Sequence, residues 1–586
     1  MLIAENHVSE YSIILPVNPS ITEKTAGKEL KNYLFEITGA MLPIYRDDKA
    51  AGEKEIVIGY TNRGGYTEEN KKELGDEGFI IKSEGEKIFI IAMGKRGVLY
   101  GVYTFLEEYC GCRFYTNDFE KVPELDSLEI PAIAENKQVP SFIYRNPYWY
   151  SVSEPGISVK LKINGEHGRW ADEGRAIPEA FGGSEVYTGG FCHTITTLNE
   201  SNDYWHQPCY NDEVVYQRVL KNVKKLLAEN PDAKILSITQ TDGNEGACKC
   251  DKCRAINEAE GSESATNVLF VNRIAEELEK DYPNVLFDTF AYRFTKYPPK
   301  TVRPRKNVQI RLCTIENCFR HPLDYENDPY GVSDKGVRTT QCFEDWGAIS
   351  ESLAVWNYDT NYTNCPVMFP NWEALLGDVK YFKAHKVISV FEQGTLASAN
   401  GEFGELKGYI VARILWDPDM SETKYWGLIK EFCDDFYGEG GKYIYEFINL
   451  QLDCSKDSHF GVYFDNPCNN IFMPGIEDHQ AACHAFADKA TELFDKAELA
   501  TKDSPFQYAN VRRSRIQLFD YIDFMLRADR DLTDDEAEKA RLSDEIYANN
   551  TNRFNFIKTY DAFTNREFRD LDEASEVDLT DYALRW

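Results

Sequence analysis

The chain has 586 residues, which is more than one hydrophobic core accommodates, so roughly two to four domains are expected. Its 42% hydrophobic and 28% charged residues are ordinary for a globular protein that folds in water. The formal charge of −32 argues against nucleic-acid partners and against an anionic membrane surface, because both require exposed basic patches.

The N-terminal residues 1–7 contain no basic segment followed by a long apolar one, so no signal peptide is expected. No stretch approaches the roughly 18 consecutive apolar residues of a transmembrane helix. These features point to a cytoplasmic location, where the 15 cysteines would be mostly thiols. A dense cysteine cluster then favours metal binding over disulfides. No feature specifies an oligomeric state.

The first 135 residues predict a small α+β domain. Short apolar runs indicate strands at 11–15, 55–59, 78–82 and 87–92, and apolar residues at helical spacing indicate helices at 25–37 and 97–109. A proline-containing stretch at 123–140 is the expected linker to the next domain.

Residues 136–420 predict a (β/α)₈ barrel, because strand and helix patterns alternate about eight times. The expected strands are 142–149, 190–198, 234–241, 285–292, 308–315, 353–358 and 387–391, and an irregular segment near 157–170 could supply an eighth. The expected helices include 213–229, 265–281, 372–384 and 405–415. A doubly wound sheet is the alternative, but the glycine-rich phosphate motif that would support it is absent.

From residue 421 the pattern is helical, with good stretches at 424–437, 479–499 and 510–527. An α-helical C-terminal domain over 421–586 is expected. The overall fold class is therefore α/β, with a barrel between a small α+β domain and a helical one.

Acidic residues stand at or near the ends of the expected barrel strands, where a barrel of this type presents its catalytic side chains. The predicted catalytic residues are Asp242, Glu245, Glu316, Asp359 and Glu392. Converging carboxyl groups suit glycoside hydrolysis, which needs a proton donor and a base, nucleophile or stabilising carboxylate. The alternative for any one of them is a structural hydrogen bond to a barrel arginine such as Arg145 or Arg311.

Other polar and aromatic side chains near strand ends are candidates for contact with substrate. The predicted substrate-binding residues are Arg145, His193, Asp288, Tyr292, Trp356 and Tyr358. Aromatic residues make up 13% of the chain, and rings such as those of Trp149, Trp170 and Tyr362 could stack on sugars or simply fill larger cores. His167 is a further histidine in a loop near the expected barrel mouth.

Three cysteines within six residues, Cys248, Cys250 and Cys253, form a Cys-x-Cys-x-x-Cys run. Cys209 is the best fourth ligand, with His206 or Cys192 as alternatives, and four such ligands predict a structural zinc site. Catalysis is expected to need no cofactor, because a zinc ion with four protein ligands has no open position. Buried free thiols are the alternative.

Several of these segments resemble the DUF4838 family. The resemblance rests on Gln-Pro-Cys at 207–209, Gln-Thr-Asp at 240–242, the cysteine run at 248–253, residues 288–292, residues 311–316 and His-Pro-Leu at 321–323. That family looks like a glycoside hydrolase barrel and includes relatives in family 163, the endo-β-N-acetylglucosaminidases. Residues 28–34 and 37–43 are similar to the N-terminal domain of family 67 α-glucuronidases and family 20 β-hexosaminidases.

The resemblance implies a glycosidase that cleaves a GlcNAc-containing linkage in an oligosaccharide or glycan. Hydrolysis could be assisted by the 2-acetamido group, with one carboxylate orienting that group and another protonating the leaving oxygen. Asp242 and Glu245 lie where family 20 places an adjacent Asp-Glu pair, but here two residues separate them, and Glu316 is the preferred alternative acid. The other hypotheses are an α-glucuronidase-like enzyme, with Arg145, Arg169 or Arg311 holding the uronate, and a non-catalytic carbohydrate-binding barrel.

Overall fold

The computed structural model describes residues 1–165, 176–243, 245–326, 329–332, 336–363, 365–395, 401–464, 466–472 and 478–560. The described chain forms two compact units. Unit 1 contains residues 1–143, 151–165 and 176–184, and unit 2 contains residues 144–150 and those from 185 onward. None of the described helices combines the length and the apolarity needed to cross a lipid bilayer.

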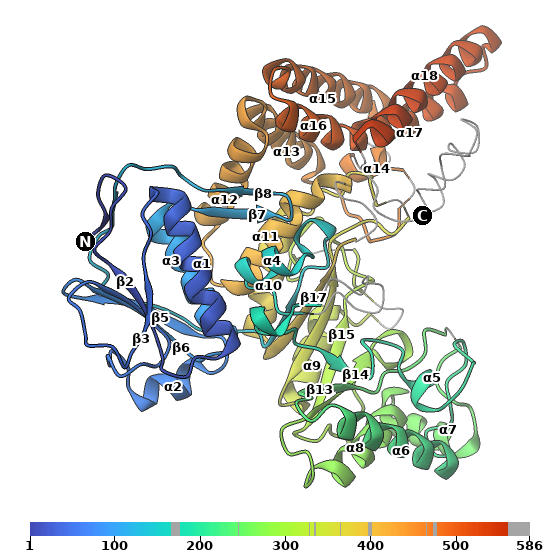
Figure 1. Ribbon diagram of the computed structural model, residues 1–586. Helices are drawn as coiled ribbons and strands as arrows, with labels where there is room; N and C mark the ends of the chain where they lie inside the picture. Colours follow the sequence, from blue (N-terminus) through green and yellow to red (C-terminus); the bar gives the residue numbers. More distant parts are fainter. Residues whose placement is uncertain are drawn as a thin grey trace. The chain divides into compact units, whose positions relative to one another are not determined.

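Unit 1 is built on a six-stranded mixed sheet (Figure 1) with the order β10-β5-β6-β4-β2-β3. Its strands are β2 (Ser12–Leu15), β3 (Ile44–Arg46), β4 (Glu55–Ile58), β5 (Phe79–Glu84), β6 (Lys87–Ala92) and β10 (Asn136–Gln138). Two small sheets pair β1 (Leu2–Ala4) with β9 (Leu128–Glu129) and β7 (Arg113–Thr116) with β8 (Phe119–Lys121). The α+β character predicted for this region agrees with these elements.

Helices cover both faces of the six-stranded sheet. They are α1 (Ile21–Thr38), α2 (Glu68–Leu74) and α3 (Gly97–Cys110), followed in the same unit by α4 (Pro155–Lys160). Strand register places Ile14, Val57 and Phe89 side by side, and Leu74 of α2 packs on them. Alternate residues such as Ile90 face the other side, where α3 approaches closely at Gly101.

Unit 2 contains a seven-stranded, wholly parallel sheet with the order β11-β17-β16-β15-β14-β13-β12. The strands are β11 (Tyr144–Asn146), β12 (Tyr187–Thr188), β13 (Ile235–Ser237), β14 (Leu286–Ala291), β15 (Val308–Cys313), β16 (Leu353–Tyr358) and β17 (Val387–Gln393). From β12 to β17 each strand pairs with its successor, and β11 pairs with the last, so the chain runs through the sheet almost in sequence order.

The sheet is curled, because its two edge strands contact each other through their side chains. The rings of Tyr144 on β11 and Tyr187 on β12 lie 5.0 Å apart, edge to face. Tyr187 also lies within hydrogen-bonding distance, 3.4 Å, of Gln309 on β15. Side chains on one face of the sheet therefore fill a closed interior.

Two sequence predictions for this sheet are wrong. Residues 190–198 do not form a strand: β12 lies just before them, and residues 195–198 form helix α5 (Ile195–Leu198). Thr194 donates a hydrogen bond to the Ser237 carbonyl at 2.8 Å, and this side-chain contact replaces regular strand pairing. The eighth strand expected near 157–170 is not found in the described part of that segment: residues 157–160 belong to α4, residues 161–165 form no strand, and residues 166–170 lie outside the described residues.

The remaining helices of unit 2 follow the strands and continue to the C-terminal region. They are α6 (Glu213–Glu229), α7 (Asp251–Glu260), α8 (Ser264–Leu278), α9 (Thr339–Ile349), α10 (Trp372–Ala384), α11 (Gly404–Trp416), α12 (Glu422–Phe436), α13 (Gly441–Ser455), α14 (Cys468–Ile471), α15 (His479–Thr501), α16 (Pro505–Ser514), α17 (Ile516–Leu532) and α18 (Glu536–Tyr560). The helix predicted at 510–527 is divided into α16 and α17 at Arg515. The helices after residue 421 belong to the same compact unit as the parallel sheet.

Candidate active site

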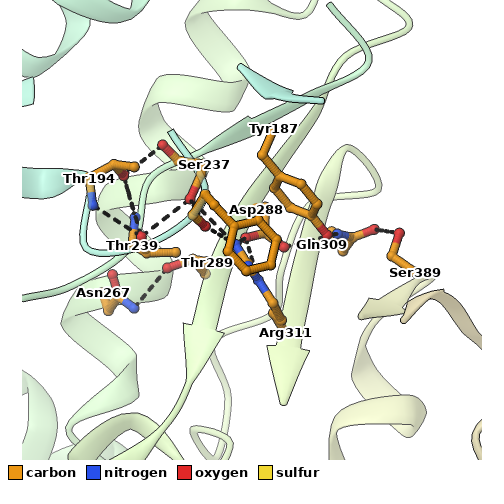
Figure 2. Close-up of polar contacts among 11 residues, drawn as sticks. Tyr187, Thr194, Ser237, Thr239, Asn267, Asp288, Thr289, Gln309, Arg311 and Ser389 are labelled. Carbon is orange, nitrogen blue, oxygen red and sulfur yellow. Dashed lines mark hydrogen bonds and ion pairs between the residues drawn. The ribbon is translucent and has the colours of Figure 1, made fainter. Parts of the chain in front are cut away.

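A buried ion pair occupies the interior of the curled sheet (Figure 2). Asp288 on β14 and Arg311 on β15 are 0% and 1% exposed, and Arg311 Nε donates to Asp288 Oδ2 at 3.0 Å. Gln309 Nε2 donates to the other carboxylate oxygen at 2.9 Å. Burial raises the pKa of Asp288, whereas the Arg311 charge and the Gln309 hydrogen bond oppose that shift. Asp288 is therefore a core residue in this structure and has no surface for a substrate.

Aromatic rings enclose the Arg311 guanidinium. Its Cζ lies 4.4 Å from the ring centroids of both Tyr187 and Phe191, and 4.7 Å from that of Phe290. Arg311 Nη1 has no hydrogen-bond acceptor among the described residues. The ring faces therefore supply the electrostatic contacts on that side of the guanidinium. Arg311 is thus committed to the interior and is not placed to hold a uronate.

Asp242 lies above this interior, after the carboxyl end of β13, and its side chain is 50% exposed. The Tyr292 hydroxyl donates to Asp242 Oδ1 at 3.2 Å, and Arg293 Nη1 donates to the Asp242 backbone oxygen at 2.6 Å. Burial, and then the Asp242 carboxylate, raise the pKa of Tyr292 far above its ordinary value, so its hydroxyl stays a donor. His193 Nε2 lies 3.9 Å from the same carboxylate oxygen.

Residues beside Asp242 adopt strained backbone conformations. His193 and Arg293 have φ of 52° each, and Tyr148, which follows β11, has φ of 46°. Such left-handed conformations are costly for residues with a side chain and concentrate at functional sites. The ring of His193 is also oriented: its Nδ1 donates to the Gln240 carbonyl at 2.8 Å, so Nε2 is the unprotonated nitrogen that faces Asp242 in the neutral ring.

Glu316 lies in the loop after β15, with a side chain that is 43% exposed. Its carboxylate lies 2.8 Å from Nζ of the buried Lys296. Burial raises the pKa of Tyr358 strongly. Tyr292, which contacts Asp242, packs in one cluster with Cys313 and Ile315, and Ile315 directly precedes Glu316. This cluster therefore extends from Asp242 to the loop that carries Glu316.

Further aromatic side chains pack beside Tyr292 and Tyr358. Trp356 is partly exposed, and its Nε1 donates to Gln393 Oε1 at 2.6 Å. Tyr362 packs on Tyr358 with ring centroids 5.6 Å apart and on Tyr463 at 5.8 Å. These rings could support a sugar by stacking.

Sequence reasoning missed Arg293, Lys296 and Tyr463. Arg293 follows Tyr292 directly, so the end of that predicted strand was a signal for it. Tyr463 has no local signal, because it lies far along the chain, between α13 and α14. The Tyr463 ring packs on the Tyr362 ring, and this contact brings the distant segment to the aromatic group around Tyr358.

Glu392 and Asp359 lie on the outer, helix-covered side of the sheet. Phe391 and Gln393 face the interior, so Glu392 between them faces outward, toward Asp378 of α10. Burial, with the charges of Asp359 and Asp378, raises the pKa of Glu392 well above its ordinary value. Burial raises the pKa of Asp359 to about 7, although Trp149 Nε1 donates to it at 2.8 Å. Neither carboxyl group reaches solvent in this structure.

Arg145 and Glu245 make contacts away from the Asp242 carboxylate, and three further positions named from the sequence lie outside the described chain. Arg145 is buried on β11, with its guanidinium 5.3 Å from the Trp416 ring of α11, on the outer face of the sheet. Glu245 is 68% exposed and pairs with His206 at 3.3 Å. His167, Arg169 and Trp170 lie outside the residues that the structure describes.

The four predicted cysteines come together. The Sγ atoms of Cys209, Cys248, Cys250 and Cys253 all lie within 4.8 Å of one another. Cys209 Sγ is 3.7 Å from both Cys250 Sγ and Cys253 Sγ. A tetrahedral zinc ion with Zn–S bonds of about 2.3 Å holds its sulfurs about 3.8 Å apart, so the thiols fit such an ion.

The cysteine group joins the loop after β12 to the loop after β13. Gln207 holds the same two loops together, because its amide donates to the Thr241 carbonyl at 3.0 Å and accepts from the Thr241 N–H at 3.1 Å. Gly243 permits a close approach, since a Cβ there would lie 1.5 Å from the Trp205 carbonyl oxygen. The group thus braces the loop that carries Asp242.

Comparisons with known families confirm the resemblance seen in the sequence. Residues 114–449 match the family described as domain of unknown function DUF4838. Residues 4–105 match the N-terminal domain of glycosyl hydrolase family 67. No curated protein is detectably similar to the chain.

Several solved structures are similar to this one. A family GH115 4-O-methyl-α-glucuronidase with specificity for decorated arabinogalactans is 11% identical, with a TM-score of 0.57 over 93% of this chain and 77% of that chain. A GH138 enzyme targeting pectin rhamnogalacturonan II is 14% identical, with a TM-score of 0.45 over 94% and 93% of the two chains. The GH20 β-N-acetylhexosaminidase of Streptomyces coelicolor A3(2) is 15% identical, with a TM-score of 0.43 over 73% and 91%. At such identities the first of these establishes a shared fold alone.

Proposed function

The chain belongs to the DUF4838 family, and we propose that it is a glycoside hydrolase. The observation that carries the proposal is the half-exposed Asp242 carboxylate, held by Tyr292 and Arg293 at the carboxyl edge of parallel strands. Exposed carboxylates at this edge suit the oxocarbenium-like transition state of glycoside hydrolysis. The matches to a glycosyl hydrolase N-terminal domain and to the fold of a GH115 enzyme support the same reaction class. On this proposal the curled sheet is a (β/α)₈ barrel.

Asp242 and Glu316 are the proposed catalytic pair. Glu316 is the proposed proton donor to the leaving oxygen, and Lys296 Nζ, 2.8 Å away, orients its carboxyl group. Asp242 stabilises the positive charge that develops at the sugar. Trp356 and Tyr362 provide ring faces for the sugar.

The proposed substrate is a GlcNAc-containing linkage in an oligosaccharide. A 2-acetamido group offers one N–H donor and one carbonyl acceptor. Asp242 Oδ1 accepts from the Tyr292 hydroxyl, and the second carboxylate oxygen can accept a hydrogen bond from the acetamido N–H. Asp242 would then orient the acetamido oxygen for attack on the anomeric carbon.

A uronate is the second candidate substrate, and Arg293 is the observation that favours it. Its guanidinium is 31% exposed beside Asp242, whereas Arg145 and Arg311 are buried. Arginine binds carboxylates in bidentate fashion, so Arg293 could hold a glucuronyl group. A preference for glucuronides that Arg293→Gln abolishes would select this candidate over the GlcNAc linkage.

Turnover of aryl glycosides tests the proposal. We expect wild type to hydrolyse the β-N-acetylglucosaminide faster than the β-glucoside. Asp242→Asn should lower kcat by about 10²–10⁴-fold with any leaving group. Glu316→Gln should lower it by a similar factor with a poor leaving group but little with dinitrophenolate, which needs no proton.

Glu245→Gln is the matched control, because Glu245 is an exposed acid three residues from Asp242. Its kcat should stay within about twofold of wild type, as surface substitutions away from a site have small effects. Undiminished turnover in both Asp242→Asn and Glu316→Gln would contradict the site. Absence of turnover by wild type on every sugar would instead favour a carbohydrate-binding barrel.

We also propose that Cys209, Cys248, Cys250 and Cys253 hold a structural zinc ion. Cys250 caps the N-terminus of α7, where its sulfur lies 3.5 Å from the Cys253 N–H, and such a position favours a thiolate. Metal analysis of the purified chain should find zinc, and Cys250→Ala should lower the zinc content by one equivalent. Zinc content unchanged by Cys250→Ala would contradict the site.

A further inference from the structure

A second group of metal-binding side chains lies in unit 2, apart from the four cysteines. Cys318 and His321 come from the loop after β15, and His459 comes from the segment between α13 and α14. We propose that Cys318, His321 and His459 bind a zinc ion.

The distances among the three ligand atoms fit one ion. Cys318 Sγ lies 3.8 Å from His321 Nδ1 and 3.6 Å from His459 Nδ1. With Zn–S of about 2.3 Å and Zn–N of about 2.0–2.1 Å, tetrahedral geometry places sulfur and nitrogen about 3.6 Å apart. All three ligand atoms lie within 4.8 Å of one another. No backbone movement is needed to bring them onto a common metal.

The ring of His321 is held in the tautomer that a metal requires. Its Nε2 lies 3.0 Å from the Lys456 carbonyl oxygen, which can only accept, so Nε2 carries the proton. Nδ1 is then the nitrogen with the free electron pair, and it faces Cys318. A ring N–H donated to a backbone carbonyl is the usual support of a metal-bound histidine. Tyr325 stacks on the same ring at 4.1 Å and fixes its plane.

The surroundings of Cys318 favour a bound thiolate over an idle thiol. Cys318 is 4% exposed and His321 is 5% exposed. The Arg320 backbone N–H donates to Cys318 Sγ at 3.4 Å, a contact that stabilises negative charge on sulfur. One thiolate with two neutral imidazoles is a borderline-soft ligand set, which suits Zn²⁺ better than Mg²⁺ or Ca²⁺.

The three residues join two distant parts of the chain, because Cys318 and His459 are 141 residues apart. The Phe319 N–H donates to the Phe460 carbonyl at 2.9 Å, so the two loops are already in register.

Metal content of the full-length chain tests this site separately from the four cysteines. In Cys250→Ala, which lacks the other cluster, we expect about one equivalent of zinc, and in Cys250→Ala with His459→Ala almost none. His459 is only partly buried, so its substitution perturbs the fold less than that of Cys318. Cys250→Ala with Cys342→Ala is the control, because Cys342 is a buried thiol in neither cluster, and it should keep one equivalent.

Cobalt substitution of Cys250→Ala reports the ligands directly. We expect a thiolate-to-cobalt charge-transfer band that Cys318→Ala abolishes. Absence of zinc from Cys250→Ala would overturn the proposal, and so would a zinc content that His459→Ala leaves unchanged.

Discussion

Two aspartate–arginine pairs in the same sheet have opposite surroundings. Asp288 and Arg311 lie within strands, are 0% and 1% exposed, and satisfy each other in the interior. Asp242 and Arg293 lie just after strands, and their side chains are 50% and 31% exposed. The Arg293 guanidinium lies 3.6 Å from the Asp242 carboxylate and donates to the Asp242 backbone instead.

The comparison separates charges that hold the fold from charges available for chemistry. A buried pair loses its hydration and depends on its partner, so its removal costs stability. The Asp242–Arg293 pair, here called the rim pair, stays hydrated. Its removal therefore costs little stability and can cost activity. Strained backbone at His193 and Arg293 accompanies only the rim pair.

Removal of Arg311 should have the largest effect on stability. Arg311→Met leaves Asp288 buried without its charge partner, and the free energy of unfolding should fall by about 3–5 kcal/mol. Urea unfolding measures it. The double variant that combines Arg311→Met with Asp288→Leu should recover most of the lost free energy, because it removes both charges. A loss of under about 1 kcal/mol in the single variant would mean that the core pair is not what holds these strands.

The buried Asp359 should make stability depend on pH. Its pKa is raised from 3.8 to about 7 in the folded chain, so the folded state holds a proton that the unfolded state releases. The free energy of unfolding should therefore fall as pH rises from about 4 to about 7, by on the order of 2–4 kcal/mol. Asp359→Asn should flatten this dependence and be more stable than wild type at pH 8. A difference between the two proteins that is constant from pH 4 to pH 8 would refute it.

Loss of the rim arginine should affect activity rather than folding. Arg293→Gln removes a charged donor to the Asp242 loop, and kcat/KM on the preferred glycoside should fall about 10–100-fold. Thermal unfolding should change little. Arg273→Gln is the control, because Arg273 is half-exposed and stacks on Tyr216 in α6, and its kcat/KM should match wild type.

The smallest effect expected is that of Asp242→Asn on stability. The side chain is half exposed and keeps an acceptor for the Tyr292 hydroxyl, so unfolding should change by under about 0.5 kcal/mol. Urea unfolding of Asp242→Asn, measured in parallel with Arg311→Met, checks this change in the free energy of unfolding. A loss comparable to that of the core variant would erase the distinction between the two pairs.

Much of the secondary structure could be predicted because periodicity is a local property. Helices α6 and α10 and strand β16 have the predicted bounds, since amphipathic spacing and β-branched runs specify them without distant partners. The segment 190–198 misled the prediction: its β-branched residues resemble a strand, but Thr194 binds the chain after β13 instead. That competition depends on residues about 40 positions away.

The candidate site divides in the same way. Asp242, Tyr292 and Glu316 are candidates from the sequence because they follow or end apolar runs, and His193 is one because a loop near the expected barrel mouth carries it. Glu392 and Arg145 also belong to strands, but they point to the outer face. Side chains alternate along a strand, so neighbouring residues face opposite sides of the sheet. Only packing against α10 and α11 decides which side is the interior.

By itself the sequence determined the class of fold, the positions of most strands and helices, and the cysteine cluster, because each depends on spacing along the chain. The tertiary structure decided which acids are accessible, that Asp288 belongs to Arg311, and that His459 joins Cys318 and His321. These outcomes depend on side chains from distant segments meeting in a curled sheet, and burial then determines whether a charge stabilises the fold or remains available for chemistry.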